Sequence, residues 1–182
     1  MKAQSRQDVH TEYPVWMVRL VNTPIRRLEG ITYWVIEDPN GIADLINTEI
    51  RREWEEDAKS EHRDPKKDEW LSTLSKRAWN LRTTDLDRIR LNLEIMNYAD
   101  RERGYIFLNR LAQRTRELQK VIENFGIVIW PLIVREEDTQ LVDGYCRYAT
   151  LKAMNISRTY VYAGTLKKRA LDRKREKDNL LL

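Results

Sequence analysis

The residues best suited to chemistry lie in one short stretch, LVDGYCRYATLKA at residues 141–153. Gly144 allows a sharp turn that a residue with a Cβ would resist, and a helix is expected to begin immediately after it. The first N–H groups of a helix have no partner within the helix and lie at the positive end of its dipole. With the Arg147 guanidinium they form an anion site that suits a phosphate. Asp143 beside it is a candidate metal ligand or proton acceptor. The pattern leaves a second interpretation open, in which Arg147 only pairs with Asp143 or another acid.

The elements around this turn are expected to place it in a sheet with packed helices. Residues 106–125 predict an amphipathic helix that ends at Gly126. Its predicted inward side chains are Phe107, Leu111, Leu118, Ile122 and Phe125. Pro131 cannot donate a ladder hydrogen bond, so the next strand is expected to begin after it.

The first half of the chain predicts two strands and two helices. Residues 15–21 and 31–37 have the β-branched and aromatic content of strands. Turn and cap residues at 38–41 predict a helix whose apolar positions are Ile42, Leu45, Ile46, Ile50 and Trp54. Asp64 and Pro65 predict a second helix, with Trp70, Leu71, Leu74, Ala78 and Leu81 on one side. We expect these helices to cover the sheet and to wall a pocket, and Trp54, Trp70 and Trp79 to belong to the core. The acids at residues 53 and 55–57 indicate a solvated helix face.

The order of these features resembles the ParB/sulfiredoxin-like superfamily. Residues 106–125 match its helix, residues 130–135 its Pro-containing strand and residues 140–142 its short strand. Residues 143–149 match its D-G-x-x-R-x-x-A-like turn, and residues 158–163 its final strand. The segment LDRIRLN at 86–92 resembles the first strand of the family and the loop after it. The resemblance implies an α+β fold with a mixed β-sheet, packed helices and an N-terminal β/helical extension. It divides the chain into an extension (1–82), a nucleotide-binding core (83–165) and a basic tail (166–182).

The motif residues separate the branches of that superfamily. Sulfiredoxins carry Gly-Cys-His-Arg with a reactive thiol, whereas this turn is Gly144-Tyr145-Cys146-Arg147, so the thiol falls one residue late. We expect Cys146 to be a small packed side chain, and a thiol-dependent repair activity stays an alternative. Partition proteins, which bind CTP, carry Gly-Glu-Arg-Arg here and are followed by a helical DNA-binding domain. Because this turn has Tyr145 and Cys146 in place of Glu-Arg, chromosome partition by that architecture is not expected.

The free-serine kinases of the superfamily resemble this turn best, because their motif begins with Asp-Gly and has one Arg. That resemblance implies that Asp143 is the catalytic or metal-side acid and that Gly144 and Arg147 hold the phosphates of ATP, ADP or CTP with Mg²⁺. Glu94 is the nearest match to the second acid of the family, one residue out of frame. Tyr145 and Cys146 replace the His-His pair of the family, and Tyr148 lies along the motif helix. These three residues are further candidates for binding the nucleotide.

The leading hypothesis is therefore an NTP-dependent phosphotransferase or NTPase that acts on a small-molecule acceptor. A non-catalytic nucleotide- or DNA-binding adaptor is the alternative. Residues 167–178 hold seven basic and three acidic residues, and this excess of four equals the net charge of the whole chain, +4. Nucleic acid is a possible partner of this tail, mainly through residues 167–177.

Composition limits the remaining classes. The 182 residues are 41% apolar and 34% charged, which suits one ordinary domain with a well-solvated surface. No apolar run approaches the roughly 20 residues that cross a bilayer, and the N-terminus lacks the apolar stretch of a secretory signal. A single cysteine cannot form an internal disulfide, so a cytoplasmic location is expected.

Overall fold

The computed structural model describes residues 23–60, 64, 66, 69–92 and 104–167, without the side chains at 57, 60, 69, 70 and 104–110. The strands are β1 (Ile25–Leu28), β2 (Ile31–Trp34), β3 (Arg77–Asp85), β4 (Val128–Ile129), β5 (Leu132–Arg135), β6 (Leu141–Asp143) and β7 (Arg158–Leu166). The helices are α2 (Pro39–Leu45), the π-helix η1 (Ile46–Ile50), α3 (Arg51–Ser60), α4 (Glu69–Thr73), α6 (Gly104–Phe125) and α7 (Tyr145–Ala153). Two 3₁₀ turns, η3 (Leu74–Lys76) and η4 (Leu86–Arg88), flank β3.

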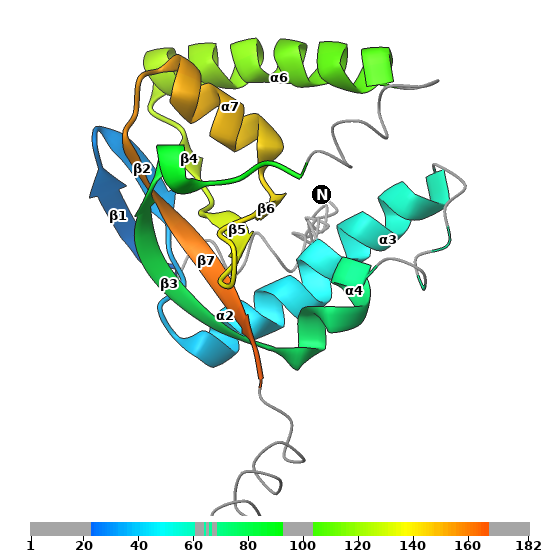
Figure 1. The fold of residues 1–182 in the computed structure, drawn as a ribbon. Coiled ribbons are helices and arrows are strands. Elements are labelled where there is room, and N and C mark those ends of the chain that lie inside the picture. The colour runs from blue at the N-terminus through cyan, green and yellow to red at the C-terminus, as the bar shows by residue number, and fades with distance from the viewer. Residues whose placement is uncertain (1–22, 61–63, 65, 67–68, 93–103, 168–182) are drawn as a thin grey trace, which may run out of the picture.

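The strands form two sheets. The small sheet has the order β1-β2-β4, and the main sheet has the order β3-β7-β5-β6. Both sheets are mixed, because β2 and β4 are parallel and β5 and β7 are parallel, whereas the other pairs are antiparallel. Helices α6 and α7 lie on one side of the molecule and α2, α3 and α4 on the other (Figure 1). The α+β class with mixed sheets, as predicted, is confirmed.

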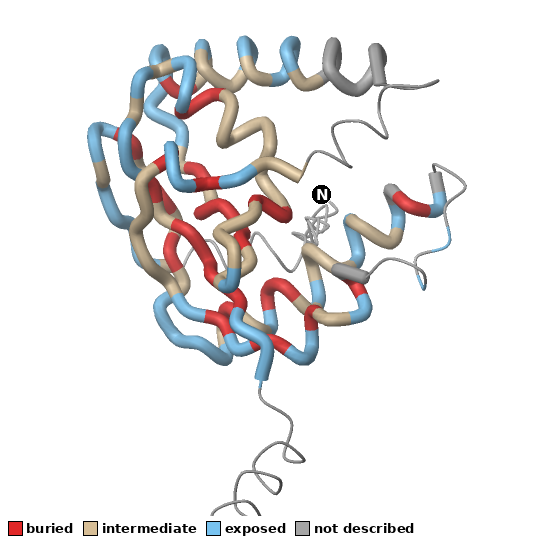
Figure 2. Tube along the Cα trace, in the orientation of Figure 1, coloured by how far each residue is buried: buried red, intermediate tan, exposed pale blue. Residues whose placement is uncertain are grey.

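Side chains of the main sheet alternate between two cores, as the period of two along a strand requires. Leu132 and Val134 belong to the first core, and Ile133 between them belongs to the second. The first core also takes in Tyr33 of the small sheet, Ile122 of α6 and Leu151 of α7. The members of the second core are Ile42, Leu45, Ile46, Leu71, Leu74, Trp79, Ile133, Val142 and Tyr162. Figure 2 shows these buried segments in the strands and in the inner parts of α2 and α7. The helices of the first half therefore cover one face of the sheet, as predicted.

The strand β3 replaces part of the second predicted helix, and this prediction was wrong. Ala78 and Leu81 lie on β3 instead of a helix, and Ala78 is exposed. All nine residues of β3 pair with β7, from Arg77 opposite Leu166 to Asp85 opposite Arg158. Helical spacing among Leu74, Ala78 and Leu81 was accidental, because pairing with a long neighbouring strand overrides local pattern.

Residues 86–92, which resembled the first strand of the family and the loop after it, do not form a strand. The segment begins with η4, and its one ladder contact is an isolated bridge between Arg90 and Gln140. The predicted division after residue 82 falls inside β3 and stays a prediction.

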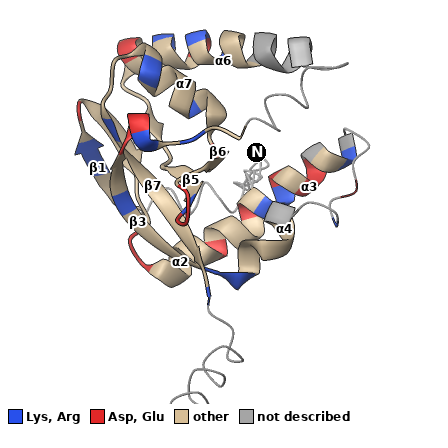
Figure 3. Ribbon diagram, viewed as in Figure 1, with Lys and Arg blue, Asp and Glu red and all other residues tan. Residues whose placement is uncertain are grey.

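The helix after β2 begins as the sequence predicts. The Asp38 carboxylate accepts the Gly41 N–H at 2.7 Å, and Pro39 occupies the first turn. The helix then widens into the π-helix η1, which no sequence pattern indicated, before it continues as α3. Charged residues of both signs lie along α3 (Figure 3), as expected for a solvated face.

Helix α6 confirms the predicted helix and its end, but not every predicted inward residue. Gly126, at a φ of 63°, stops the helix and donates to the Ile122 carbonyl. Ile122 is buried, whereas Phe125 is 80% exposed, so the inward placement of Phe125 was wrong. Phe125 is the last residue of α6, directly before the Gly126 stop.

Short turns connect the remaining elements. Pro131 separates β4 from β5, so the prediction that the strand begins after this proline is confirmed. The tight turn at Glu29 and Gly30, both with positive φ, joins β1 to β2. The Glu29 carboxylate accepts the Ser157 N–H at 2.6 Å and thereby ties this turn to the start of β7. Residues 15–21 and 168–182 lie outside the described residues. No helix in the described ranges has the length and apolarity that crossing a membrane requires.

Candidate functional site

Asp143 and Arg147 form an ion pair across the first turn of α7. The Arg147 Nη2 donates to the Asp143 carboxylate at 2.6 Å. The Arg147 Nη1 donates to the carbonyl oxygens of Trp130 at 3.0 Å and of Pro131 at 2.8 Å. The Arg147 side chain is 19% exposed and the Asp143 side chain 26%, so the pair is partly screened from water. The guanidinium is thus fixed at one nitrogen by the backbone and turned toward a carboxylate at the other.

Gly144 lies between them in a left-handed conformation with a φ of 98°. A Cβ at this position would approach Leu132 to 2.8 Å and the Arg147 Nη2 to 3.1 Å. The backbone conformation therefore favours glycine, and a Cβ would also force the Leu132 side chain to shift. As the N-cap residue it supplies no side-chain acceptor to the first N–H groups of α7.

The other predicted motif residues have structural contacts. The Tyr145 hydroxyl donates to the Leu141 carbonyl at 3.2 Å and accepts the Asn92 N–H at 3.3 Å, and burial raises the pKa of Tyr145 to about 12. Tyr148 packs against the first core. Cys146 is a free, half-buried thiol, and its carbonyl accepts the Thr150 hydroxyl at 2.8 Å.

A cavity of about 260 Å³ lies beside the ion pair. Its lining within the described residues combines an apolar surface with three acids and one arginine, and comprises Leu45, Glu49, Ile50, Glu53, Trp130, Pro131, Ile133, Asp143, Arg147 and Tyr162. The structure therefore brings Asp143 and Arg147 to this cavity, but not Gly144, Tyr145, Cys146 or Tyr148. Such a concave, mostly apolar site with a few polar groups is typical of small-molecule binding.

The wall opposite α7 comes from η1 and the start of α3. A π-turn inside a helix is rare and is frequent at functional sites. Here it places Glu49 and Ile50 on the cavity, one turn after Leu45. The Glu49 side chain is 16% exposed and pairs at 2.9 Å with Arg52, which is 58% exposed.

The aromatic part of the lining is held in place by a second tryptophan. Trp130 contacts Trp34 of β2 with ring centroids 5.9 Å apart and planes tilted by 47°. Tyr162 of β7 accepts the Ile36 N–H at 3.0 Å through its hydroxyl, and burial raises its pKa to about 12. Both rings are therefore fixed from outside the cavity.

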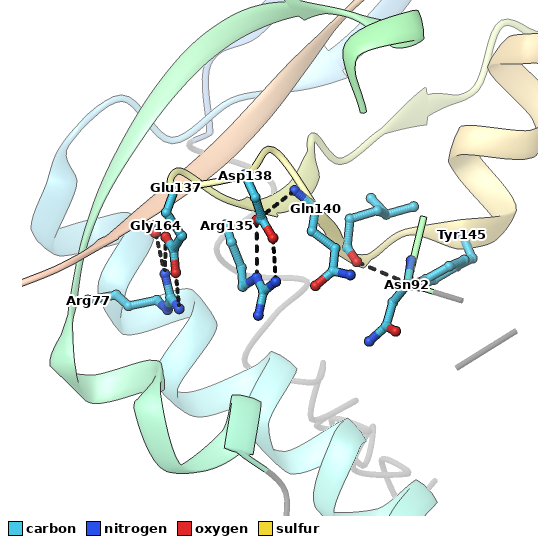
Figure 4. Close-up of polar contacts among 9 residues, drawn as sticks. Arg77, Asn92, Arg135, Glu137, Asp138, Gln140, Tyr145 and Gly164 are labelled. Carbon is cyan, nitrogen blue, oxygen red and sulfur yellow. Dashed lines mark hydrogen bonds and ion pairs between the residues drawn. The ribbon is translucent and has the colours of Figure 1, made fainter. Parts of the chain in front are cut away.

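The hairpin of β5 and β6, which carries Asp143, is stabilised by contacts of two arginines, Arg77 and Arg135 (Figure 4). Arg77, 4% exposed, donates to both Glu137 oxygens at 2.8 and 2.9 Å and to the Gly164 carbonyl at 2.6 Å. The hydrogen bonds from Arg77 hold the pKa of Glu137 below its usual range. Arg135 pairs with Asp138, whose carboxylate also accepts the Gln140 N–H at 3.1 Å. These contacts fix the loop between β5 and β6, and β6 ends at Asp143.

Two predicted features lie outside this geometry. Glu94 and residues 168–182 of the basic tail fall outside the described residues, and the described chain before Glu94 ends at Asn92, beside Tyr145. Among the residues that the structure describes, no group of three or more His, Cys, Asp or Glu side chains is placed to hold a metal ion. The proposed metal role of Asp143 stays a prediction.

The sequence did not indicate Glu49, Glu53 or Trp130 as site residues. Glu53 was assigned to a solvated acidic face, and Trp130 to a strand. Their shared position depends on how η1 packs on the main sheet, which is a long-range relationship. The one usable signal was the expectation that the helices of the first half wall a pocket.

Comparisons with known proteins give a partial likeness. No protein-family model matches the chain, and neither does any curated protein. A solved structure described as the pNOB8-like ParB N-domain matches 50% of this chain at 15% identity, with a TM-score of 0.36. A second, described as the C2221 form of the Pnob8-like ParB-N domain, matches 56% at 13% identity, with a TM-score of 0.33. The match covers 29% and 34% of those chains, respectively, so this chain is similar to about a third of each.

Proposed function

We propose that this chain binds a nucleoside phosphate in the cavity beside α7, with the phosphate at the Asp143–Arg147 pair. The observation that carries the proposal is the position of that pair. It lines a cavity, and it lies next to a helix amino end whose N-cap offers no side-chain acceptor. The positive end of the α7 dipole favours an anion at such a position.

Arg147 can change its anionic partner from Asp143 to a phosphate without moving. Its Nη1 stays on the Trp130 and Pro131 carbonyls, so the guanidinium keeps its place when Nη2 changes partner. A phosphate offers more charge and more acceptor oxygens than the Asp143 carboxylate. The incoming phosphate therefore displaces Asp143 from Arg147.

The reaction that this arrangement supports is phosphoryl transfer. Asp143, once released from Arg147, accepts the proton of an acceptor hydroxyl or of water. The oxygen of that group forms a bond to the γ-phosphorus while the bond from this phosphorus to the bridging oxygen breaks, and a nucleoside diphosphate leaves. Arg147 neutralises charge on the phosphoryl group, and such positioning carries most of the catalysis in this class. The described residues do not form a metal site of their own, so no step here relies on Mg²⁺.

Thermal shift with ATP, ADP, CTP and GTP, each with and without Mg²⁺, tests the binding. At least one nucleotide is expected to raise the melting temperature of the wild type, and Arg147→Lys is expected to lose most of that rise, because lysine cannot hold both carbonyls and the phosphate. Arg135→Lys is the matched control, since Arg135 also pairs with a nearby aspartate at similar burial, 31% and 28%, but does not line the cavity. No shift with any nucleotide, or equal shifts in wild type and Arg147→Lys, would contradict the proposal.

Release of inorganic phosphate distinguishes an enzyme from a binding module. Phosphate release by the wild type that is lost in Asp143→Asn supports the phosphotransferase or NTPase. Binding without turnover would instead make the chain a nucleotide-binding adaptor.

A further inference from the structure

The wall of the cavity opposite α7 has a chemistry different from that of the phosphate end. We infer that this wall recognises a nucleobase with an exocyclic amino group, and that Glu49 accepts a hydrogen bond from that group. The inference rests on the proposed function, because it assigns the base end of the same ligand.

Charge is the first argument. The lining carries three acids, Glu49, Glu53 and Asp143, against the single guanidinium of Arg147. That guanidinium already donates to two carbonyl oxygens and one carboxylate. The wall formed by η1 and α3 brings the carboxylates of Glu49 and Glu53 to the cavity, and it suits the part of a ligand that donates hydrogen bonds.

The burial of Glu49 is the second argument. Its side chain is only 16% exposed, although a carboxylate is an acceptor that water normally solvates. Its partner Arg52 is 58% exposed and therefore offers little compensation. A ligand N–H at Glu49 forms a charge-assisted hydrogen bond, and acidic side chains accept in this way from base amino groups.

Shape and lining are the third argument. Trp130, held by Trp34, supplies an aromatic face, and Leu45 and Ile50 line the cavity from the helix side. Bases stack well on such a face. A cavity of about 260 Å³ lies near the lower end of the roughly 300–1,000 Å³ of most ligand pockets, which suits a small planar base at this wall.

Nucleosides without phosphate test this inference on the full chain. Three pairs isolate the amino group: adenosine with inosine, guanosine with inosine, and cytidine with uridine. In calorimetric titrations, at least one amino-bearing nucleoside is expected to bind about tenfold more tightly than its counterpart, as one charge-assisted hydrogen bond implies. Glu49→Met, which removes every acceptor at similar length, is expected to bring the two affinities together.

Glu56→Met is the matched control, because Glu56 also approaches Arg52, at 4.0 Å, but is 67% exposed and does not line the cavity. It is expected to keep the preference. If Glu49→Met does not fold, Glu49→Gln keeps the shape and one acceptor, and it is expected to reduce the preference. Absence of any preference in the wild type, absence of nucleoside binding, or a preference that survives in the Glu49 variant would each overturn the inference.

Comparison with the 5′-monophosphates separates the two proposals. A gain in affinity from the phosphate that depends on Arg147, without any amino preference, leaves the proposed function and removes this inference. An amino preference without a gain in affinity from the phosphate supports base recognition at Glu49 and contradicts phosphate binding at Arg147.

Discussion

The Arg147 guanidinium donates to the Asp143 carboxylate at 2.6 Å, and both side chains line the same cavity. Gly144 lies between them with a positive φ, and the Arg147 guanidinium would lie 3.1 Å from a Cβ added there. The local sequence that forms the turn therefore also sets the geometry of the candidate site.

Gly144→Ala is expected to destabilise the protein by about 1–3 kcal/mol, because the new Cβ would strain the backbone and meet Leu132 at 2.8 Å. Denaturant unfolding measures this loss. Gly126→Ala is the control, since Gly126 also has a positive φ, 63°, but a Cβ added there would meet nothing within 4 Å. It is expected to lose only about 1 kcal/mol. Equal losses in the two variants would show that the approach of Leu132 and Arg147 to Gly144 is not tight.

Gly164→Ala tests the packing of β7 on β3. A Cβ on Gly164 would approach the Trp79 ring to 2.6 Å, and Trp79 is 1% exposed in the second core. Overpacking of this kind costs about 1–3 kcal/mol. The cost is expected to shrink in a Trp79→Leu background, where the space is free. An undiminished cost in that double-mutant cycle would rule out the ring contact as its cause.

The sequence was sufficient where local chemistry decides the structure. The Asp38 cap, the Gly126 stop, the break at Pro131 and the Gly144 turn are each set by one or two residues, and each is confirmed. It was insufficient for β3, where pairing with β7 overrides an accidental helical spacing.

In the candidate site, too, the sequence predicts the local contacts and not the long-range ones. Asp143 and Arg147 are four residues apart, so their pairing follows from one helical turn. Glu49 and Trp130 are distant in the sequence, and they meet at the cavity only because η1 packs on the main sheet. The π-helix η1 itself was not indicated by any pattern in the sequence.

Ile122 and Phe125, both near the end of α6, are expected to differ in their effect on stability. Ile122→Ala is expected to cost about 2–5 kcal/mol, because Ile122 is buried in the first core. Phe125→Ala is expected to change stability by less than about 0.5 kcal/mol, since Phe125 is 80% exposed. Chemical denaturation compares them, and a large loss in the Phe125 variant would contradict the observed orientation of the helix.

The contact between Arg77 and Glu137 predicts a pH dependence. Hydrogen bonds from Arg77 lower the pKa of Glu137 in the folded protein. The pair therefore stabilises the fold fully above the unfolded pKa of about 4.3, and the contribution is lost as the pH falls through the lowered folded value. The difference in unfolding free energy between wild type and Glu137→Gln is expected to be full at neutral pH and to shrink in acid. A difference that stays constant or grows as the pH falls would contradict this assignment.

The affinity of Asp143→Asn for a nucleotide tests the central claim most directly. If phosphate displaces Asp143 from Arg147, then removing the carboxylate charge releases Arg147 and removes repulsion from the phosphate. Titrated without Mg²⁺ at low ionic strength, Asp143→Asn is expected to bind the nucleotide about two- to tenfold more tightly than the wild type. Equal or weaker binding by Asp143→Asn would contradict the account.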